Sequence, residues 1–241
     1  FKGTECLAPM VRAGSLPLRL LALQYGADTV WGEELVDRRV SAAVRHVNHH
    51  LGTIDYVNNG KSVAFRTCDA ERGRVVFQLG TSDAARARAA AEAVARDVAA
   101  VDVNMGCPKR FSIQGGMGAA LLTNPDVACD IIATLRRALP VPVTAKIRLL
   151  DTAAATVELA RRLEAAGAAA LTVHARLRST DPKEPALWDM LRPVVDSVGI
   201  PVIANGDIYS RADMATVRAQ TGCASVMLAR PALLNCSVFD K

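Results

Sequence analysis

Residues 141–176 read VPVTAKIRLLDTAAATVELARRLEAAGAAALTVHAR, and they contain the pattern that decides the fold. An apolar run rich in β-branched residues occupies 141–148, and helical spacing follows over 152–166. The helical pattern stops at Gly167, and a second apolar run covers 169–176. Continuous apolar strands on either side of an amphipathic helix are typical of a parallel sheet that helices cover. This stretch therefore predicts a strand, a helix and a second, parallel strand.

The same alternation recurs along most of the chain. The apolar runs occupy 6–10, 28–33, 74–80, 100–105, 141–148, 169–176, 200–206 and 225–230. Helices over 82–97 and 125–139 are equally well marked, with Asp83 near the start of the first and Asn124 as the cap of the second. Eight such units in 241 residues predict an α/β fold, a closed (β/α)8 TIM barrel with parallel strands. An open doubly wound sheet is the alternative.

Composition limits the classes of partner and the compartment. Apolar residues make up 51% of the chain, yet no uncharged apolar run approaches the ~18 residues of a membrane span, so we expect no membrane contact. The net charge of +5 favours an anionic partner. The six cysteines lie far apart without metal-binding spacing, which predicts reduced thiols in an intracellular protein, cytoplasmic first, with nucleus and organelles left open. His46, His49 and His50 have the spacing of one helical face, but without a matching carboxylate we interpret them as surface residues and expect no metal.

Two connections are longer than the others. The polar stretch at about 41–68 indicates an insertion after the second unit. The stretch 106–122 carries Cys107, Gly115, Gly116 and Gly118 between the fourth strand and its helix. Loops in this position build the active face of a barrel. A thiol with an ordinary pKa of about 8.5 is mostly protonated at neutral pH, so Cys107 suits proton donation, or attack once it is activated. Glu33 and Glu34 could belong to the site, or they could stabilise a helix structurally, since acidic residues before a helix also suit its dipole.

Polar residues at the ends of apolar strands are the strongest sign of a site. They are Gln78, Asn104, Lys146, Arg148, His174, Arg176 and Asn205. A buried polar group without a partner costs about 1 to 3 kcal/mol, so seven that converge on one barrel mouth indicate function. Lys146 fits a Schiff base, a ligand to an anionic cofactor, or a lysine that reaches solvent at the strand tip. Gly206 after the seventh strand and Arg230 after the eighth predict a phosphate site.

Taken together, the motifs resemble those of the tRNA-dihydrouridine synthases, and within them the eukaryotic branch that acts on position 20. The resemblance rests on the segments LAPMVR (7–12), YGAD (25–28), EEL (33–35), VVFQLG (75–80), VDVNMGCPK (101–109), GGMGAALL (115–122), KIR (146–148) and VIANG (202–206). The NMGCP element with the later GGMG is the specific part, because the barrel segments alone would fit other flavin barrels. The resemblance implies reduction of a D-loop uridine of tRNA to 5,6-dihydrouridine, with bound FMN and with NADPH as hydride donor.

The resemblance also implies roles for individual residues. Cys107 would be the catalytic proton donor. The cofactor would contact Pro9, Met10, Val11, Gln78, Lys146 and His174, and its phosphate would contact Asn205, Gly206, Asp207, Ala229 and Arg230. The uracil would face Asn104 and Arg148, and the tRNA backbone would meet basic residues of the rim, Lys109 and Arg176 among them.

The domain organisation expected from the resemblance is one FMN-binding TIM-barrel catalytic domain over 1–241. The helical tRNA-binding domain that follows the barrel in the family is expected to be absent, because the chain stops at Lys241. Two other functions stay open, a flavin-dependent reductase of a free pyrimidine and an inactive RNA-binding barrel. The Cys-Pro loop and the basic rim argue against the first, and intact Cys107, Lys146 and His174 argue against the second. The oligomeric state is not predicted.

Overall fold

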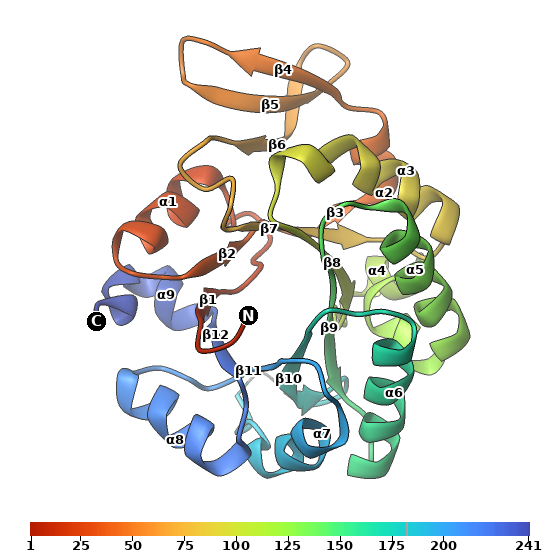
Figure 1. Cartoon of the computed structure of the whole chain (residues 1–241), viewed down its shortest axis with the longest axis vertical. Helices are drawn as coiled ribbons and strands as arrows, with labels where there is room; N and C mark the ends of the chain where they lie inside the picture. The colour runs from red at the N-terminus through yellow and green to blue at the C-terminus, as the bar shows by residue number, and fades with distance from the viewer. Residues whose placement is uncertain (182) are drawn as a thin grey trace.

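Eight parallel strands form a closed ring in the computed structural model, which describes residues 1–181 and 183–241 (Figure 1). They are β1 (Glu5–Leu7), β2 (Thr29–Trp31), β7 (Val75–Gly80), β8 (Ala100–Met105), β9 (Val143–Leu149), β10 (Leu171–Leu177), β11 (Val202–Asn205) and β12 (Ser225–Leu228). Each strand pairs with the next along the chain, and β12 pairs with β1. This last pairing closes the sheet, so the predicted TIM barrel is confirmed and the open sheet is excluded.

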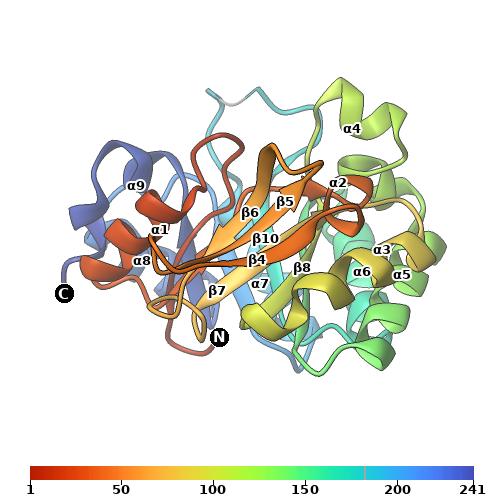
Figure 2. The ribbon, with the colours of Figure 1, turned by 90° about the horizontal axis from the view of Figure 1, so that it is seen from above.

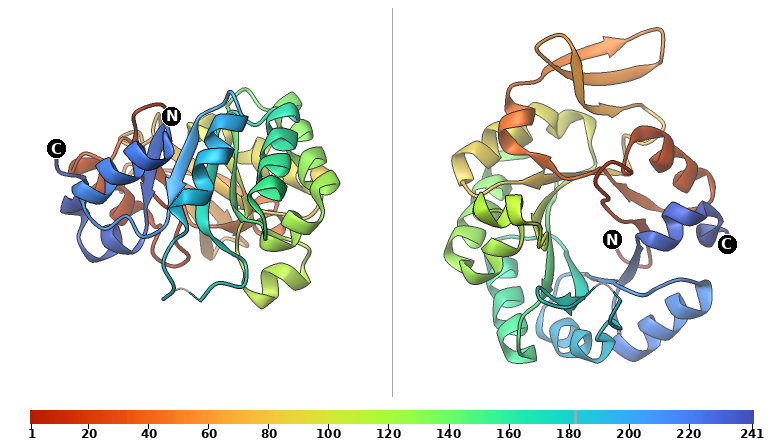
Figure 3. Two further views of the ribbon diagram at one scale, coloured as in Figure 1. Left: turned by 90° about the horizontal axis from the view of Figure 1, so that it is seen from below. Right: turned by 180° about the vertical axis from the view of Figure 1, so that it is seen from behind.

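Helices surround the ring, as the view from behind in Figure 3 shows. They are α1 (Leu16–Gln24), α3 (Ala84–Val94), α5 (Pro125–Ala138), α6 (Ala153–Ala165), α7 (Leu191–Ser197), α8 (Arg211–Thr221) and α9 (Arg230–Leu234). The predicted start and end of α6 are present in the structure. The Thr152 hydroxyl caps the helix by accepting the Ala155 N–H, and Gly167 follows the helix with φ of 105°. Asn124 occupies the cap position of α5, but its side chain makes no capping hydrogen bond.

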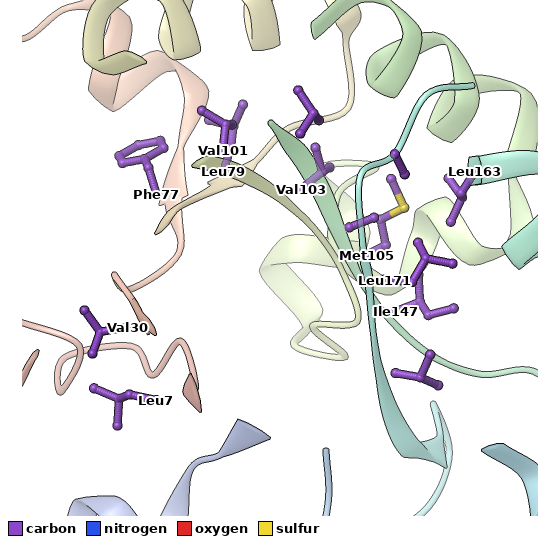
Figure 4. Close-up of a cluster of buried hydrophobic side chains, with 14 of the residues drawn as sticks. Leu7, Val30, Phe77, Leu79, Val101, Val103, Met105, Ile147, Leu163 and Leu171 are labelled. Carbon is purple, nitrogen blue, oxygen red and sulfur yellow. The ribbon is translucent and has the colours of Figure 1, made fainter. Parts of the chain in front are cut away.

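Strand alternation sorts the barrel residues into two sets. One set points out toward the helices and forms the main core; Figure 4 shows part of it, including Phe77, Val101 and Ile147. The other set points into the barrel, where apolar residues such as Trp31 and Met227 pack together. Gln78, Asn104, Lys146, His174 and Asn205 have the inward parity on their strands, because side chains alternate with a period of two. The polar strand-end residues therefore meet inside one end of the barrel.

The segment after the second barrel strand folds as a separate antiparallel sheet outside the ring (Figures 1 and 2). Short elements β3 (Leu35–Val36) and α2 (Asp37–Ser41) lead to β4 (Val44–Asn48), β5 (Thr53–Asn58) and β6 (Ser62–Thr67). The sheet is tied to the barrel by Asp97, which accepts hydrogen bonds from Arg45 at 2.7 Å and from the Tyr56 hydroxyl at 2.6 Å.

The three histidines do not lie on a helix, so the helical interpretation of their spacing is wrong. His46 lies in β4 opposite Asp55, and His49 and His50 form the turn that follows, because pairing with β5 imposes an extended backbone. Within residues 1–181 and 183–241, no group of three or more His, Cys, Asp or Glu side chains could hold a metal ion. In the same part of the chain, no helix combines the length and apolar character needed to cross a bilayer.

Candidate active site

Two adjoining cavities occupy the end of the barrel at which the strands finish. The first, of about 180 Å³, is called the thiol pocket, and it is lined by Pro9, Val11, Glu34, Gln78, Asn104, Gly106, Cys107, Pro108, Lys146, Arg148 and His174. The second, of about 120 Å³, is called the basic pocket, and its lining includes Arg148, His174, Arg176, Asn205, Gly206, Asp207, Tyr209, Ala229 and Arg230. Arg148 and His174 line both, so the two pockets form one continuous site.

Local geometry places the Cys107 thiol at the wall of the thiol pocket. The Asn104 side-chain oxygen accepts the backbone N–H groups of Gly106 at 2.9 Å and Cys107 at 3.0 Å, which holds the start of the loop. The loop continues through α4 (Arg110–Gln114) and returns at Gly118, which has φ of 58°. A Cβ there would lie 2.7 Å from the Cys107 carbonyl oxygen, so glycine is required for this close return. Burial raises the pKa of the Cys107 thiol above its ordinary value, and the thiol is therefore protonated at neutral pH.

A buried carboxyl group orients the polar residues of β7 and β8. Asp102 accepts hydrogen bonds from the Gln78 amide at 2.8 Å and from the Thr144 hydroxyl at 2.6 Å. The Asn104 amide in turn donates to the Gln78 oxygen at 3.3 Å. Burial raises the pKa of Asp102 to about 6 despite these donors. Together these hydrogen bonds fix the orientation of the Gln78 amide at the pocket wall.

The positive side chains at the centre of the site are partly desolvated. Lys146 donates to the Asn205 side-chain oxygen at 3.0 Å, and burial, with nearby Arg148, lowers the pKa of Lys146 to about 8. Burial also holds the pKa of His174 far below its usual range, and the positive charges around the ring lower it further. His174 is therefore a neutral imidazole at physiological pH, able to donate one hydrogen bond and accept another.

The basic pocket is organised around Asp207. Its carboxylate accepts hydrogen bonds from Arg176 at 2.6 Å, from Arg230 at 3.0 Å and from the Ala186 N–H at 2.7 Å. Burial works to raise the pKa of Asp207, but these donors outweigh it and the pKa lies below its ordinary value. The Arg230 guanidinium also lies over the Tyr209 ring, 5.5 Å from its centre. Arg148, Arg176 and Arg230 exceed the single charge of Asp207, so this pocket suits an anion.

Most residues predicted for the site line it, and three are placed differently. Arg176 was expected on the rim, but it is 3% exposed and lies inside the basic pocket beside His174. Met10 packs against the core next to the pocket wall, and Lys109 is exposed at the start of α4, beyond the cavity.

Two residues of the site were missed by sequence reasoning or left undecided. Asp102 was not singled out, although an acid between two valines of an apolar strand was a usable signal. Glu34 was left undecided between function and helix dipole, and it lines the thiol pocket with Cys107.

The family model described as dihydrouridine synthase matches residues 6–241. The chain belongs to this family. The resemblance inferred from the Cys-Pro and glycine motifs is thus confirmed.

Curated relatives agree with this assignment. The chain is 40% identical over 250 residues to the tRNA-dihydrouridine(20) synthase of Schizosaccharomyces pombe, covering 99% of the chain and 52% of that protein. It is 40% identical over 225 residues to the enzyme of the same name from Saccharomyces cerevisiae, covering 88% of the chain and 59% of that protein. The chain therefore spans only about half the length of these relatives. Among solved structures, a nitroalkane oxidase from Streptomyces ansochromogenes aligns with a TM-score of 0.55 and 18% identity over 96% of the chain and 66% of that protein, which supports the barrel fold.

Proposed function

We propose that this barrel is the catalytic part of an FMN-dependent enzyme that reduces a D-loop uridine of tRNA to 5,6-dihydrouridine, at position 20, with NADPH as hydride donor. The observation that carries the proposal is the shared cavity of Cys107 and Lys146, which opens into a pocket rich in arginine. The names of both relatives described above specify position 20 of tRNA and include NAD(P)+.

The residues present fit a flavin mononucleotide. The basic pocket offers Arg230 and the backbone of Gly206 and Ala229 to a phosphate. The thiol pocket offers an apolar wall from Pro9 and Val11, with Met10 packed behind it, to an aromatic ring system. Gln78, Lys146 and His174 would hydrogen-bond the ring and the side chain of the cofactor, and Asn205 and Asp207 would position the cations that surround it. When bound, FMN supplies the hydride for uracil C6.

The protein's own contribution is a proton and a pocket for the base. The Cys107 thiol would protonate uracil C5, which completes saturation of the C5–C6 bond. Arg148 is held by two backbone carbonyls, donating to Gly106 at 2.8 Å and to Leu177 at 3.0 Å, and together with Asn104 it would contact the uracil. The base must leave its stack to reach this depth. Exposed Lys109 beside the mouth would contact the tRNA backbone.

Residues 1–241 would form one FMN-binding barrel domain with the β4–β6 sheet as its insertion. An intracellular location, cytoplasmic first, goes with tRNA as substrate and with the six cysteines, for which the structure shows free thiols.

The visible spectrum of the purified protein tests this function. We expect a bound flavin whose absorbance NADPH bleaches and unmodified tRNA restores, whereas free uridine leaves it bleached. A protein that stays colourless after addition of FMN would refute the proposal. Equal re-oxidation by free uridine would identify a reductase of free pyrimidines. Re-oxidation by neither substrate, together with binding of tRNA, would identify an inactive RNA-binding barrel.

The Cys107→Ala variant tests the role of the thiol. We expect it to keep its flavin but to form dihydrouridine about 10² to 10⁴ times more slowly, because general acid catalysis contributes rate factors of that size. Cys129→Ala is the matched control, since Cys129 is a half-buried thiol of α5 outside the thiol pocket. Dihydrouridine can be counted by mass spectrometry of digested tRNA. Equal rates in the two variants would rule out Cys107 as the acid.

A further inference from the structure

Glu34 lines the same pocket as Cys107, and one of its carboxyl oxygens is buried. Its Oε1 is shielded from solvent and has no hydrogen-bond partner among the described residues. Gly80 at the end of β7 makes room for it, because a Cβ on Gly80 would lie 2.6 Å from this oxygen. Leaving a buried acceptor unpaired costs about 1 to 3 kcal/mol, and such groups in native proteins call for an explanation. The position beside a reactive thiol provides one.

The carboxyl group and the thiol influence each other's ionisation. Burial raises the pKa of Glu34 to about 6, and the neighbouring Cys107 thiol partly opposes this. Burial raises the pKa of Cys107, and the negative charge of Glu34 raises it further. Arg148 on β9 faces the thiol with a positive charge, Lys146 lies on the same strand, and His174 on β10 is neutral. Glu34 is thus the acidic neighbour that works against the arginine.

We infer that Glu34 governs the proton of Cys107: its carboxylate keeps the thiol protonated before reaction, and afterwards it takes a proton from solvent and passes it to the thiolate. The inference rests on the proposed function. When uracil C5 is protonated, the S–H bond of Cys107 breaks and a C–H bond forms, leaving a thiolate beside the Glu34 carboxylate. Two adjacent negative charges favour uptake of a solvent proton by the carboxylate. The O–H bond of Glu34 then breaks as the S–H bond re-forms, and Glu34 is again a carboxylate.

The relative acidities of Glu34 and Cys107 favour proton transfer from the carboxylic acid back to the thiolate. A carboxylic acid with a pKa of about 6 is a far stronger acid than a thiol whose pKa is raised, so the proton moves to sulfur. Glu34 acts through Cys107 and is therefore a positioning residue. Its signature is a change in the ionisation of one thiol, which a merely structural side chain would not produce.

The test measures the pKa of the Cys107 thiol in wild type and in Glu34→Gln. The rate of iodoacetamide alkylation is followed from pH 6 to pH 10.5 by mass spectrometry of the peptide that contains Cys107, with no tRNA and no nicotinamide present. Loss of one negative charge about 4 Å away would lower the thiol pKa by up to about three pH units at an effective dielectric constant near 20. Glu33→Gln is the control, because the Glu33 carboxylate accepts the Arg12 N–H instead of facing the thiol pocket. Equal thiol pKa values in wild type and Glu34→Gln would overturn the inference.

Two further measurements separate the effect from misfolding and from the proposed function. Glu34→Asp keeps the charge, so its thiol pKa should lie closer to that of wild type, and a value equal to that of Glu34→Gln would count against the inference. In single turnovers on tRNA, the alkaline loss of rate should begin at lower pH in Glu34→Gln, and an unmoved pH profile would refute control of the proton. The alkylation result does not depend on turnover, so failure of the proposed tRNA activity would show separately.

Discussion

The buried ion pair between Arg19 on α1 and Glu71 supports both the barrel and the wall of its active site. Arg19 donates to the two Glu71 carboxylate oxygens at 2.8 and 2.6 Å, and the side chains are 2% and 0% exposed. Arg19 also donates to the backbone carbonyls of Gly14 at 2.6 Å and Arg66 at 2.7 Å. The pair thereby connects α1 to the loop that carries Pro9 and to the end of β6.

Replacing Glu71 with glutamine keeps the shape but leaves the guanidinium buried without a counter-charge. Breaking a buried pair in this way costs about 3 to 5 kcal/mol. In a domain of this size each kcal/mol shifts the melting temperature by about 2 to 4 °C, so we expect Glu71→Gln to melt about 6 to 20 °C below wild type. Thermal unfolding followed by circular dichroism, with urea unfolding at 25 °C, measures the loss.

Two controls separate the buried charge from other effects. Asp69→Asn removes a carboxylate that is 89% exposed and 3.8 Å from Arg72, and it should change stability by no more than about 0.5 kcal/mol. The double variant Arg19→Met with Glu71→Met removes both charges and should lose less stability than Glu71→Gln, because an apolar pair leaves no charge uncompensated. If Glu71→Gln stays within about 1 kcal/mol of wild type, or if the double variant loses more, the reasoning is wrong.

Two other predictions concern the active site. The pKa of Lys146 is lowered to about 8 and an anionic cofactor would raise it, so FMN affinity should fall by up to about tenfold per pH unit above pH 8; a fluorescence titration in which Lys146→Met shows the same slope as wild type would contradict this. Gly118→Ala places a Cβ against the Cys107 carbonyl at positive φ and should cost about 1 to 3 kcal/mol and slow dihydrouridine formation while FMN still binds. Gly73→Ala, where a Cβ meets no atom within 4 Å, is its control in both urea unfolding and turnover, and equal losses in the two variants would refute the account.

The barrel could be read from the chain because its signals are local. The run of valines and threonine around Lys146, the cap at Thr152 and the stop at Gly167 lie within one strand–helix unit, and the structure contains that unit with small shifts at its ends. The same locality explains the error at His46. A spacing of three and four residues is helical only when no partner strand is present, and β5, which follows in the chain, imposes extended backbone.

In the candidate site, too, the features that depend on local sequence were predicted and those that depend on tertiary contacts were not. Polar residues at strand ends were visible in the sequence because their neighbours are apolar, and parallel strands deliver their ends to one mouth. Contacts between side chains of different barrel units could not be predicted from the sequence. Arg176 lies inside because Asp207, in the loop after the next strand, accepts its hydrogen bonds. Glu34 reaches the same pocket as Cys107 only after β2 and β8 take their places on either side of β7. Periodicity is a property of residues close together in the chain, whereas these contacts depend on ring closure and register, which bring together segments tens of residues apart.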